Sequence, residues 1–340
     1  MKKVTVIMFV LIIGLTLTAC GGRQTSSVST DADSANRGAG ETYAVVASLG
    51  QPEFFDALKS GVYTACEEIG AAWYITGPQD MEPDRLVQAI DQAVSNNVTG
   101  IILHGQMPET AEAINNAVDA GVPVIIVNTD IPSKRLSFLG CGPYQVGYDM
   151  GTKMVEILNG KAGTVVVSFA IAHPSSIEIA EGIHDVLERL PGIRVVDVDD
   201  TADANIAATN NGAALQAYPD VVGMIGVMAY SSVGICTAIR EVDKIGQIVV
   251  IGRDRDAATL ELIENGEMAA SYAQNSFVEA YIATMWLHDY VNGNLKVIDD
   301  YLGAKVNPLP KVVDSGSIII DKSNYKQFME PYKYVVTARN

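Results

Sequence analysis

Residues 72–103 (AWYITGPQDMEPDRLVQAIDQAVSNNVTGIIL) contain the pattern that decides the fold. Short apolar runs at 72–76 and 100–103 flank a stretch in which apolar residues recur at helical spacing from Leu86 to Val94. The flanking runs are apolar at most positions, which is typical of parallel strands covered by helices on both faces. The stretch therefore predicts a strand–helix–strand unit with a right-handed crossover.

This unit repeats along the chain. Helical patterns separate the apolar runs, and about 300 residues exceed the usual size of a single domain. We expect an α/β fold with two lobes, each a doubly wound parallel sheet with helices on both faces. Strands are predicted at residues 43–48, 72–76, 100–103, 123–127 and 136–140 for the first lobe, and at 164–169, 193–198, 222–227 and 248–252 for the second.

Breaks in this pattern indicate the domain boundaries. The apolar periodicity pauses at 140–148, where we expect the chain to enter the second lobe. A later helix at 278–290 and a strand at 317–320 allow a return to the first lobe and a further crossing. Several crossings predict a hinge with a ligand cleft, because ligands of open parallel sheets bind beyond the carboxyl ends of strands. The expected organisation is a signal peptide at 1–20, a tether at 21–41, a first lobe at 42–143 plus about 276–308, and a second lobe at 144–275 plus about 309–340.

The amino terminus has the features of a secretory signal. Lys2 and Lys3 precede an apolar run at 4–17 that is too short for a mature membrane-spanning helix. The run ends in LTACG at 17–21, which resembles the bacterial lipobox with its lipidated cysteine. We therefore expect acyl chains on Cys20 to anchor the protein to the cell membrane, outside the cytoplasm.

Composition narrows the possible partners. The formal net charge is −17, and no basic cluster predicts contact with nucleic acid, so membrane contact is expected through the lipid anchor only. The polar segment at 21–41 has too little apolar surface to fold, which predicts the tether. Cys66, Cys141 and Cys236 are far apart in the sequence and predict buried free thiols.

Motifs for catalysis are missing from the sequence. It has no GxSxG elbow and no GxxxxGK[ST] loop, and Gln145 stands where a GxGxxG motif beginning at Gly140 needs its third glycine. The four histidines form no HxxxH or HExxH pair for a metal. We expect a binding protein without cofactor or metal, not an enzyme.

Aromatic and polar residues follow several predicted strands. Phe54 fits the apolar stripe of the helix after the first strand, so its neighbour Phe55, together with the edge of Phe54, is expected to face the cleft. Carboxylates and amides suit the hydroxyls of a sugar, and aromatic rings suit its C–H faces. Helix capping is the competing explanation for any one polar residue here. The candidate ligand residues are Phe54, Phe55, Asn128, Asp130, Asp254 and Gln274.

From residue 43 to about residue 322 the chain resembles the periplasmic sugar-binding proteins of the ribose-binding type. This resemblance implies the type 1 periplasmic binding protein fold and places both phenylalanines against the apolar faces of the ligand. The matching stretches are PEFFDALKSG at 52–61, NTDIP at 128–132, KRLSFLGCGPYQVG at 134–147, IGRDRD at 251–256 and GEMAASYAQ at 266–274.

The resemblance also implies roles for polar residues. Asn128 takes the place of a hydroxyl-binding acid, with Asp130 close by. Asp254 and Gln274 take the places of a carboxylate and an amide that clamp the sugar from the second lobe and the hinge.

Two positions depart from the family pattern. Ile177 stands at the place of an arginine, and Met228 stands at the place of an asparagine. The wall of the second lobe is therefore less polar, which favours a deoxy, smaller or partly apolar solute over ribose. Either Arg253 or Arg255 could replace the missing cation, and the sequence does not choose between them.

These features predict an extracytoplasmic solute-binding lipoprotein of an ABC importer. We expect a monomer that is mostly open when empty, with contacts from both lobes to a small sugar or polyol-like solute favouring closure. The closed form would dock on the ABC permease in the membrane. The alternatives are a sensory protein of the same fold that serves a chemoreceptor or histidine kinase, and an extracellular hydrolase.

Overall fold

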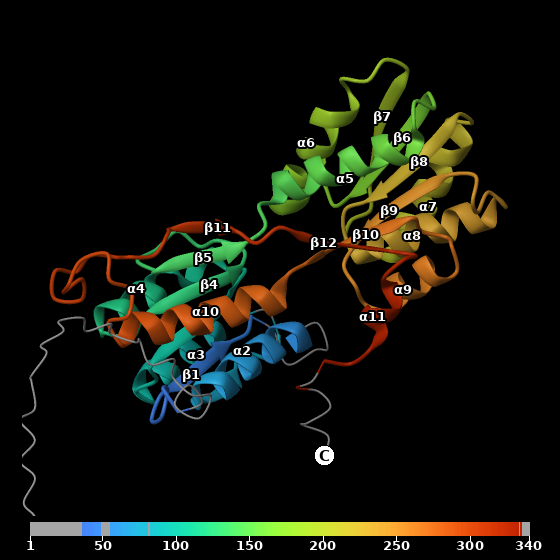
Figure 1. Ribbon diagram of the computed structural model, residues 1–340. Helices are drawn as coiled ribbons and strands as arrows, with labels where there is room; N and C mark the ends of the chain where they lie inside the picture. The colour runs from blue at the N-terminus through green and yellow to red at the C-terminus, as the bar shows by residue number, and fades with distance from the viewer. Residues whose placement is uncertain (1–35, 49–54, 81, 333, 335–340) are drawn as a thin grey trace, which may run out of the picture.

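The computed structural model describes residues 36–48, 55–80, 82–332 and 334. It shows two α/β lobes joined by several segments of chain (Figure 1). Each lobe is a sheet between two layers of helices, which confirms the predicted fold class. Cys20, Phe54, the expected signal peptide and most of the expected tether lie outside the described residues. In the described part of the chain, no helix has the length and apolar character needed to span a bilayer.

The first lobe is built on a sheet with the strand order β11-β5-β4-β3-β1-β2, in which neighbouring strands are parallel. Its strands are β1 (Thr42–Val46), β2 (Ala72–Thr76), β3 (Gly100–Gly105), β4 (Val124–Asn128), β5 (Ser137–Gly140) and β11 (Val312–Asp314). Its helices are α2 (Asp56–Ile69), α3 (Pro83–Ser95), the 3-10 turn η2 (Pro108–Thr110), α4 (Ala111–Asp119) and α10 (Ser276–Val291). Helices α2 and α10 cover one face of the sheet, and α3 and α4 cover the other.

The second lobe has the strand order β12-β10-β9-β8-β6-β7, parallel except that β12 runs antiparallel to β10. Its strands are β6 (Gly163–Phe169), β7 (Ile193–Asp199), β8 (Val221–Gly226), β9 (Val249–Arg253), β10 (Ala270–Gln274) and β12 (Ser317–Asp321). Its helices are α5 (Pro143–Leu158), α6 (Pro174–Leu187), α7 (Ala204–Ala217), α8 (Ala229–Glu241), α9 (Ala257–Glu264) and α11 (Tyr325–Met329). Helices α5 and α6 cover one face, and α7, α8 and α9 cover the other.

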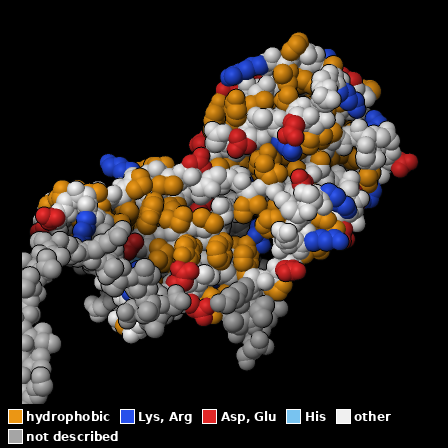
Figure 2. Space-filling view, viewed as in Figure 1, with side chains coloured by type: hydrophobic (Ala, Val, Ile, Leu, Met, Phe, Trp, Pro, Cys, Tyr) orange, Lys and Arg blue, Asp and Glu red, His pale blue; other side chains and the backbone are white. Residues whose placement is uncertain are grey.

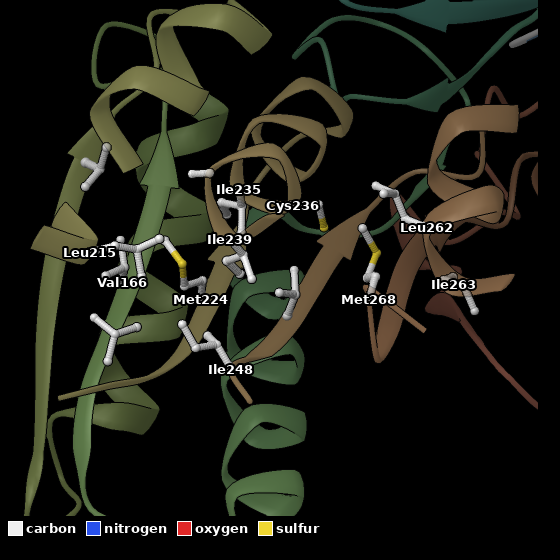
Figure 3. Packing of buried hydrophobic residues seen from close by; sticks show 14 of the residues in the cluster. Val166, Leu215, Met224, Ile235, Cys236, Ile239, Ile248, Leu262, Ile263 and Met268 are labelled. Atoms are coloured by element: carbon white, nitrogen blue, oxygen red, sulfur yellow. The ribbon is translucent and has the colours of Figure 1, made fainter. Parts of the chain in front are cut away.

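Neighbouring residues of one strand enter different cores. Met224 of β8 packs with Leu215 of α7 and Ile239 of α8 (Figure 3). The next residue, Ile225, belongs to the opposite core, together with Met150 of α5. Burying each such side chain contributes about 1.5–3 kcal/mol. The strand must be apolar throughout because both of its faces are covered.

Three segments cross between the lobes (Figure 1). Residues 141–142 follow β5, Asn275 follows β10, and residues 315–316 follow β11. The last crossing therefore lies after Asp314, a few residues later than the expected boundary near 309. Strand β11, which was not predicted from the sequence, keeps this segment in the first sheet.

After α11 the chain contacts the first lobe again. The ring of Tyr332 stacks on Phe277 of α10 with centroids 6.1 Å apart, and its hydroxyl accepts a hydrogen bond from Arg255 of the second lobe. The ring of Tyr334 lies 5.2 Å from that of Trp73 in β2. We call Tyr332 and Tyr334 the aromatic strap. It bridges both lobes, whereas residues 309–340 were expected to belong to the second.

Candidate ligand-binding site

The carboxyl ends of the strands in both sheets meet at the hinge. In the first lobe the chain leaves β5 and β11 at these ends to cross over, and both strands run parallel to β4, β3 and β1. In the second lobe it leaves β10 in the same way, parallel to β9, β8 and β6. The loops after these strands border the junction of the lobes, where the outline of the molecule is indented (Figure 2).

Asn128 is the last residue of β4 and has the left-handed backbone conformation, with φ 77°. Asparagine tolerates this conformation better than most residues. Its amide donates hydrogen bonds to the carbonyl oxygen of Gly105 at 3.0 Å and to the hydroxyl of Thr129 at 3.2 Å. A Cβ added at Gly105 would lie 1.9 Å from the carbonyl oxygen of Thr129, so only glycine allows this close approach. The half-buried Asn128 is therefore fixed at the edge of the first sheet.

Asp130 lies just beyond Asn128 and forms a bidentate ion pair with Arg135. Both N–O distances are 2.6 Å. The Arg135 side chain is 8% exposed and that of Asp130 is 31% exposed. A carboxylate has about four lone-pair sites, so this pairing leaves acceptor capacity for a ligand.

Phe55 differs from the expectation that it faces the cleft. It is 2% exposed and belongs to the core between the first sheet and helices α2 and α10. Its ring meets that of His104 edge-on, with centroids 4.8 Å apart. Phe55 is therefore a core residue of the first lobe.

A polar cluster at the ends of β1 and β3 was missed by the sequence analysis. The buried hydroxyl of Ser48 lies 2.8 Å from Nδ1 of His104 and 3.1 Å from Oε1 of Gln106. Burial lowers the pKa of His104 to about 4, so its ring is neutral at neutral pH. The rule that drew attention to Asn128, a polar residue at a strand end, would also have found this cluster.

Asp254 follows β9 and, like Asn128, has a left-handed backbone, with φ 73°. Its N–H donates to the carbonyl oxygen of Tyr272 at 3.0 Å, and its carboxylate accepts the N–H of Ala229 at 3.2 Å. Ala229 begins α8, and a helix amino terminus favours a nearby negative charge. Burial nevertheless raises the pKa of Asp254, with the charge of Arg253 opposing this shift.

Gln274 is the last residue of β10 and immediately precedes the second crossing. It is half-buried and lies opposite Ser317 of β12 in the antiparallel pair. The structure thus places Asn128 and Asp130 at the carboxyl edge of the first sheet, and Asp254 and Gln274 at that of the second.

Met228, Tyr230 and Arg253 lie beside Asp254. Nη1 of Arg253 is 3.9 Å from the sulfur of Met228. Burial and the neighbouring carboxylates of Asp200 and Asp254 raise the pKa of Tyr230 to about 12. Tyr230 was not among the predicted site residues, although it follows β8 as the other candidates follow their strands.

Arg255 has different surroundings from Arg253. Its guanidinium lies 4.7 Å from the ring centroid of Tyr332 and 5.3 Å from that of Phe328. It also donates a hydrogen bond to the Tyr332 hydroxyl. Arg255 therefore holds the aromatic strap.

A separate hollow of about 530 Å³ lies on the second lobe, between α6 and the edge strand β7. None of the described candidate ligand residues lines it. His184 in this hollow bonds Asp197 at 2.7 Å and Glu188 at 2.8 Å, which raises its pKa to about 9. The lining residues are Tyr144, Phe169, Ile177, Ala180, Glu181, His184, Asp185 and Asp197.

Within the described residues, no group of His, Cys, Asp and Glu is arranged to hold a metal ion. Cys66, Cys141 and Cys236 are buried and free, as predicted.

Comparison with known proteins identifies the family. Residues 43–295 match the model of the periplasmic binding protein domain, so the chain belongs to the periplasmic binding protein family. Members of this family capture solutes outside the cytoplasm. The chain is accordingly a solute-binding protein and not an enzyme.

Several named relatives are similar over most of their length. The xylose/arabinose-binding protein of Sulfolobus acidocaldarius is 24% identical over 302 residues, which cover 83% of this chain and 71% of that protein. The ribose import binding protein of Salmonella typhimurium is 27% identical, with 71% and 81% covered. Among solved structures, the arabinose-binding protein of Geobacillus stearothermophilus has a TM-score of 0.79 at 24% identity, covering 85% of this chain and 99% of that one. A sugar-binding protein of an ABC transporter from Bacillus halodurans has a TM-score of 0.77 at 27% identity, with 85% and 100% covered.

Proposed function

We propose that this protein is the lipid-anchored capture subunit of an ABC importer and binds a small sugar or polyol between its lobes. One observation carries the proposal: polar side chains stand at the carboxyl ends of strands in both sheets, and these ends meet at one hinge. Named relatives bind xylose, arabinose, ribose and xylitol, which supports the same class of ligand here.

Each lobe supplies half of the binding site. The first lobe offers Asn128 and Asp130, with Phe54 as the ring against the C–H face of the sugar. The second lobe and the hinge offer Asp254 and Gln274. Sugar hydroxyls both donate and accept hydrogen bonds, so amide and carboxylate groups at fixed positions suit them. Hydrogen bonds within the protein fix the side chains of Asn128 and Asp254, which lowers the entropy cost of binding.

Closure of the hinge couples binding to transport. A ligand that touches both lobes has its full set of contacts only in the closed form and shifts the population toward it. The permease then recognises the closed form. The lobes in this proposal are residues 42–140 with 276–314, and 143–274 with 317–330, and acylated Cys20 holds them at the membrane.

The first test is ligand binding by the mature protein. Calorimetric titration with D-ribose, D-xylose, L-arabinose, D-arabinose, xylitol and D-allose should find at least one binder, and small-angle scattering should show a smaller radius of gyration with that compound. If no compound binds and none changes the scattering, the proposed ligand class is wrong.

A matched pair of variants tests the site. Asp254→Asn should weaken binding roughly 10- to 100-fold, because a charged acceptor of ligand hydroxyls is lost. Asp256→Asn is the control, since Asp256 caps α9 through Thr259 and is exposed. Equal affinities for the two variants would remove Asp254 from the site.

The lipid anchor has an independent test. Cys20→Ser should move the protein from the membrane fraction to the soluble extracytoplasmic fraction, because the acyl chains that provide its membrane affinity are then absent. A variant that remains in the membrane fraction would contradict the proposed anchor.

A further inference from the structure

Arg253 has an unusual environment for an arginine. It is the last residue of β9, and its side chain is half-buried. Its backbone N–H faces the Ser232 hydroxyl at 3.4 Å, and its guanidinium reaches the sulfur of Met228 at 3.9 Å. None of the described carboxylates forms an ion pair with it, in contrast to the bidentate partner of Arg135.

The guanidinium therefore has more donors than acceptors around it. Arginine carries five N–H donors, and a thioether sulfur is a weak acceptor. Taking a charged group partly out of water without satisfying its donors costs free energy. Such a group is ready to bind acceptor oxygens from outside the protein.

The neighbours of Arg253 place this unsatisfied group at the candidate site. Asp254 is the next residue, and its carboxylate is fixed at the start of α8 by the N–H of Ala229. Tyr230 follows Ala229 in the first turn of α8 and so lies next to the N–H that binds the Asp254 carboxylate. Arg253 and Asp254 thus form a donor and an acceptor of opposite charge, side by side at the carboxyl edge of the second sheet.

We propose that Arg253 is a specificity-determining residue that binds two neighbouring hydroxyls of the ligand together with Asp254; this inference rests on the proposed function. Arg253 donates hydrogen bonds to the oxygens of the hydroxyl pair, and the same hydroxyls donate to Asp254. Neutral sugars and polyols with vicinal hydroxyls match this arrangement. The opposite charges of the two residues balance, so the pair favours a neutral ligand over a sugar acid.

Arg255 provides a matched control. It lies two residues further along the chain, but it is held by Tyr332 and Phe328 of the carboxyl-terminal region. Methionine has a similar length to the apolar part of arginine and keeps its packing without the donors. Arg253→Met and Arg255→Met therefore remove the same group from two different surroundings.

The experiment measures the affinity of both variants by calorimetry with the compound of the six-member panel that binds the unmodified protein most tightly. Arg253→Met should raise Kd roughly 10- to 100-fold, and Arg253→Lys should raise it less, because lysine keeps the charge but not the fork of donors. Arg255→Met should raise Kd clearly less than Arg253→Met does, since it removes a contact to the aromatic strap and none of the ligand's hydrogen bonds.

Deoxy analogues of the same compound identify the hydroxyls involved. The unmodified protein should discriminate strongly against the analogue that lacks a hydroxyl bound by Arg253, and Arg253→Met should lose most of that discrimination. An unchanged Kd and unchanged discrimination in Arg253→Met overturn the inference while the proposed function stands. If the unmodified protein binds no member of the panel, both are overturned. Circular dichroism verifies that each variant is folded.

Discussion

The carboxyl group of Glu279 accepts a hydrogen bond from the hydroxyl of Ser315, 2.6 Å away, and so joins the second chain crossing of the hinge to the third. Glu279 lies in the first turn of α10 and is 0% exposed. The backbone N–H of Asn128 also lies close enough to this carboxyl to lower its pKa. A single buried acid therefore connects two hinge segments with a candidate ligand residue.

This contact predicts a pH-dependent stability. Burial is the main reason why the pKa of Glu279 rises from 4.5 to about 7 in the folded protein. The Ser315 hydroxyl and the Asn128 N–H oppose this shift, and the nearby Asp314 adds to it. The native state therefore holds the proton more tightly, and its stability falls as pH rises from about 4.5 to about 7. Glu279→Gln should abolish this part of the slope, on the order of 3 kcal/mol between pH 5 and pH 8.

Urea unfolding of the unmodified protein and of Glu279→Gln at both pH values measures this difference. Other titrating groups are the same in the two proteins and cancel. Equal losses of stability between pH 5 and pH 8 would contradict the prediction.

The ion pair between Asp130 and Arg135 predicts a stability effect of a different kind. Asp130→Asn should destabilise the protein by about 2 kcal/mol, because it leaves a nearly buried guanidinium without its charged partner. Asp119→Asn serves as the control, since the pair of Asp119 with Lys134 is more than half exposed and contributes little. Similar unfolding midpoints for the two variants would show that Arg135 does not depend on Asp130.

We expect the aromatic strap to restrain the relative motion of the two lobes. Tyr332→Ala should widen the distribution of distances between spin labels placed on the two lobes, because the contacts from Phe277 and Arg255 to this ring are lost. Tyr332→Phe should preserve most of the narrow distribution, since it keeps the stacked ring. Pulsed electron resonance measures both variants, and an unchanged width in Tyr332→Ala would argue against a restraint.

We expect the imidazole of His184 to be charged at neutral pH. Its bonds to Asp197 and Glu188 raise its pKa to about 9, so the ring should titrate well above pH 7 in an NMR experiment. Asp197→Asn should lower the midpoint, because it removes the stronger of the two stabilising contacts. A midpoint near the ordinary value of 6.5 in the unmodified protein would contradict this prediction.

Much of the fold could be predicted because its signals are local. The strand expected at 72–76 is observed at Ala72–Thr76, and the helix expected at 278–290 is α10, which spans Ser276–Val291. Strand β11 could not be predicted in this way. It has only three residues, none of them buried, and its partner β5 lies more than 150 residues earlier in the chain.

The candidate site was predictable to a lesser degree. Strand ends identified Asn128, Asp254 and Gln274 as candidates because parallel strands present their carboxyl ends at one edge. The same reasoning placed Phe55 at the cleft although it is buried, because helix α2 begins only at Asp56 and the helical spacing used for the prediction does not extend to Phe55. It also did not reveal the role of Glu279, whose partners Ser315 and Asn128 are remote in the sequence.

The sequence alone determined that this chain forms two α/β lobes, because the period of apolar residues depends only on near neighbours and on whether one or both faces are covered. The tertiary structure alone decided which polar groups are free for a ligand. Arg253 and Arg255 are two residues apart and equivalent by pattern. Arg255 donates a hydrogen bond to Tyr332, 77 residues further along the chain, whereas Arg253 lies beside Asp254 and Met228. Such pairings depend on contacts between distant segments, which become fixed only when the lobes and the hinge have folded.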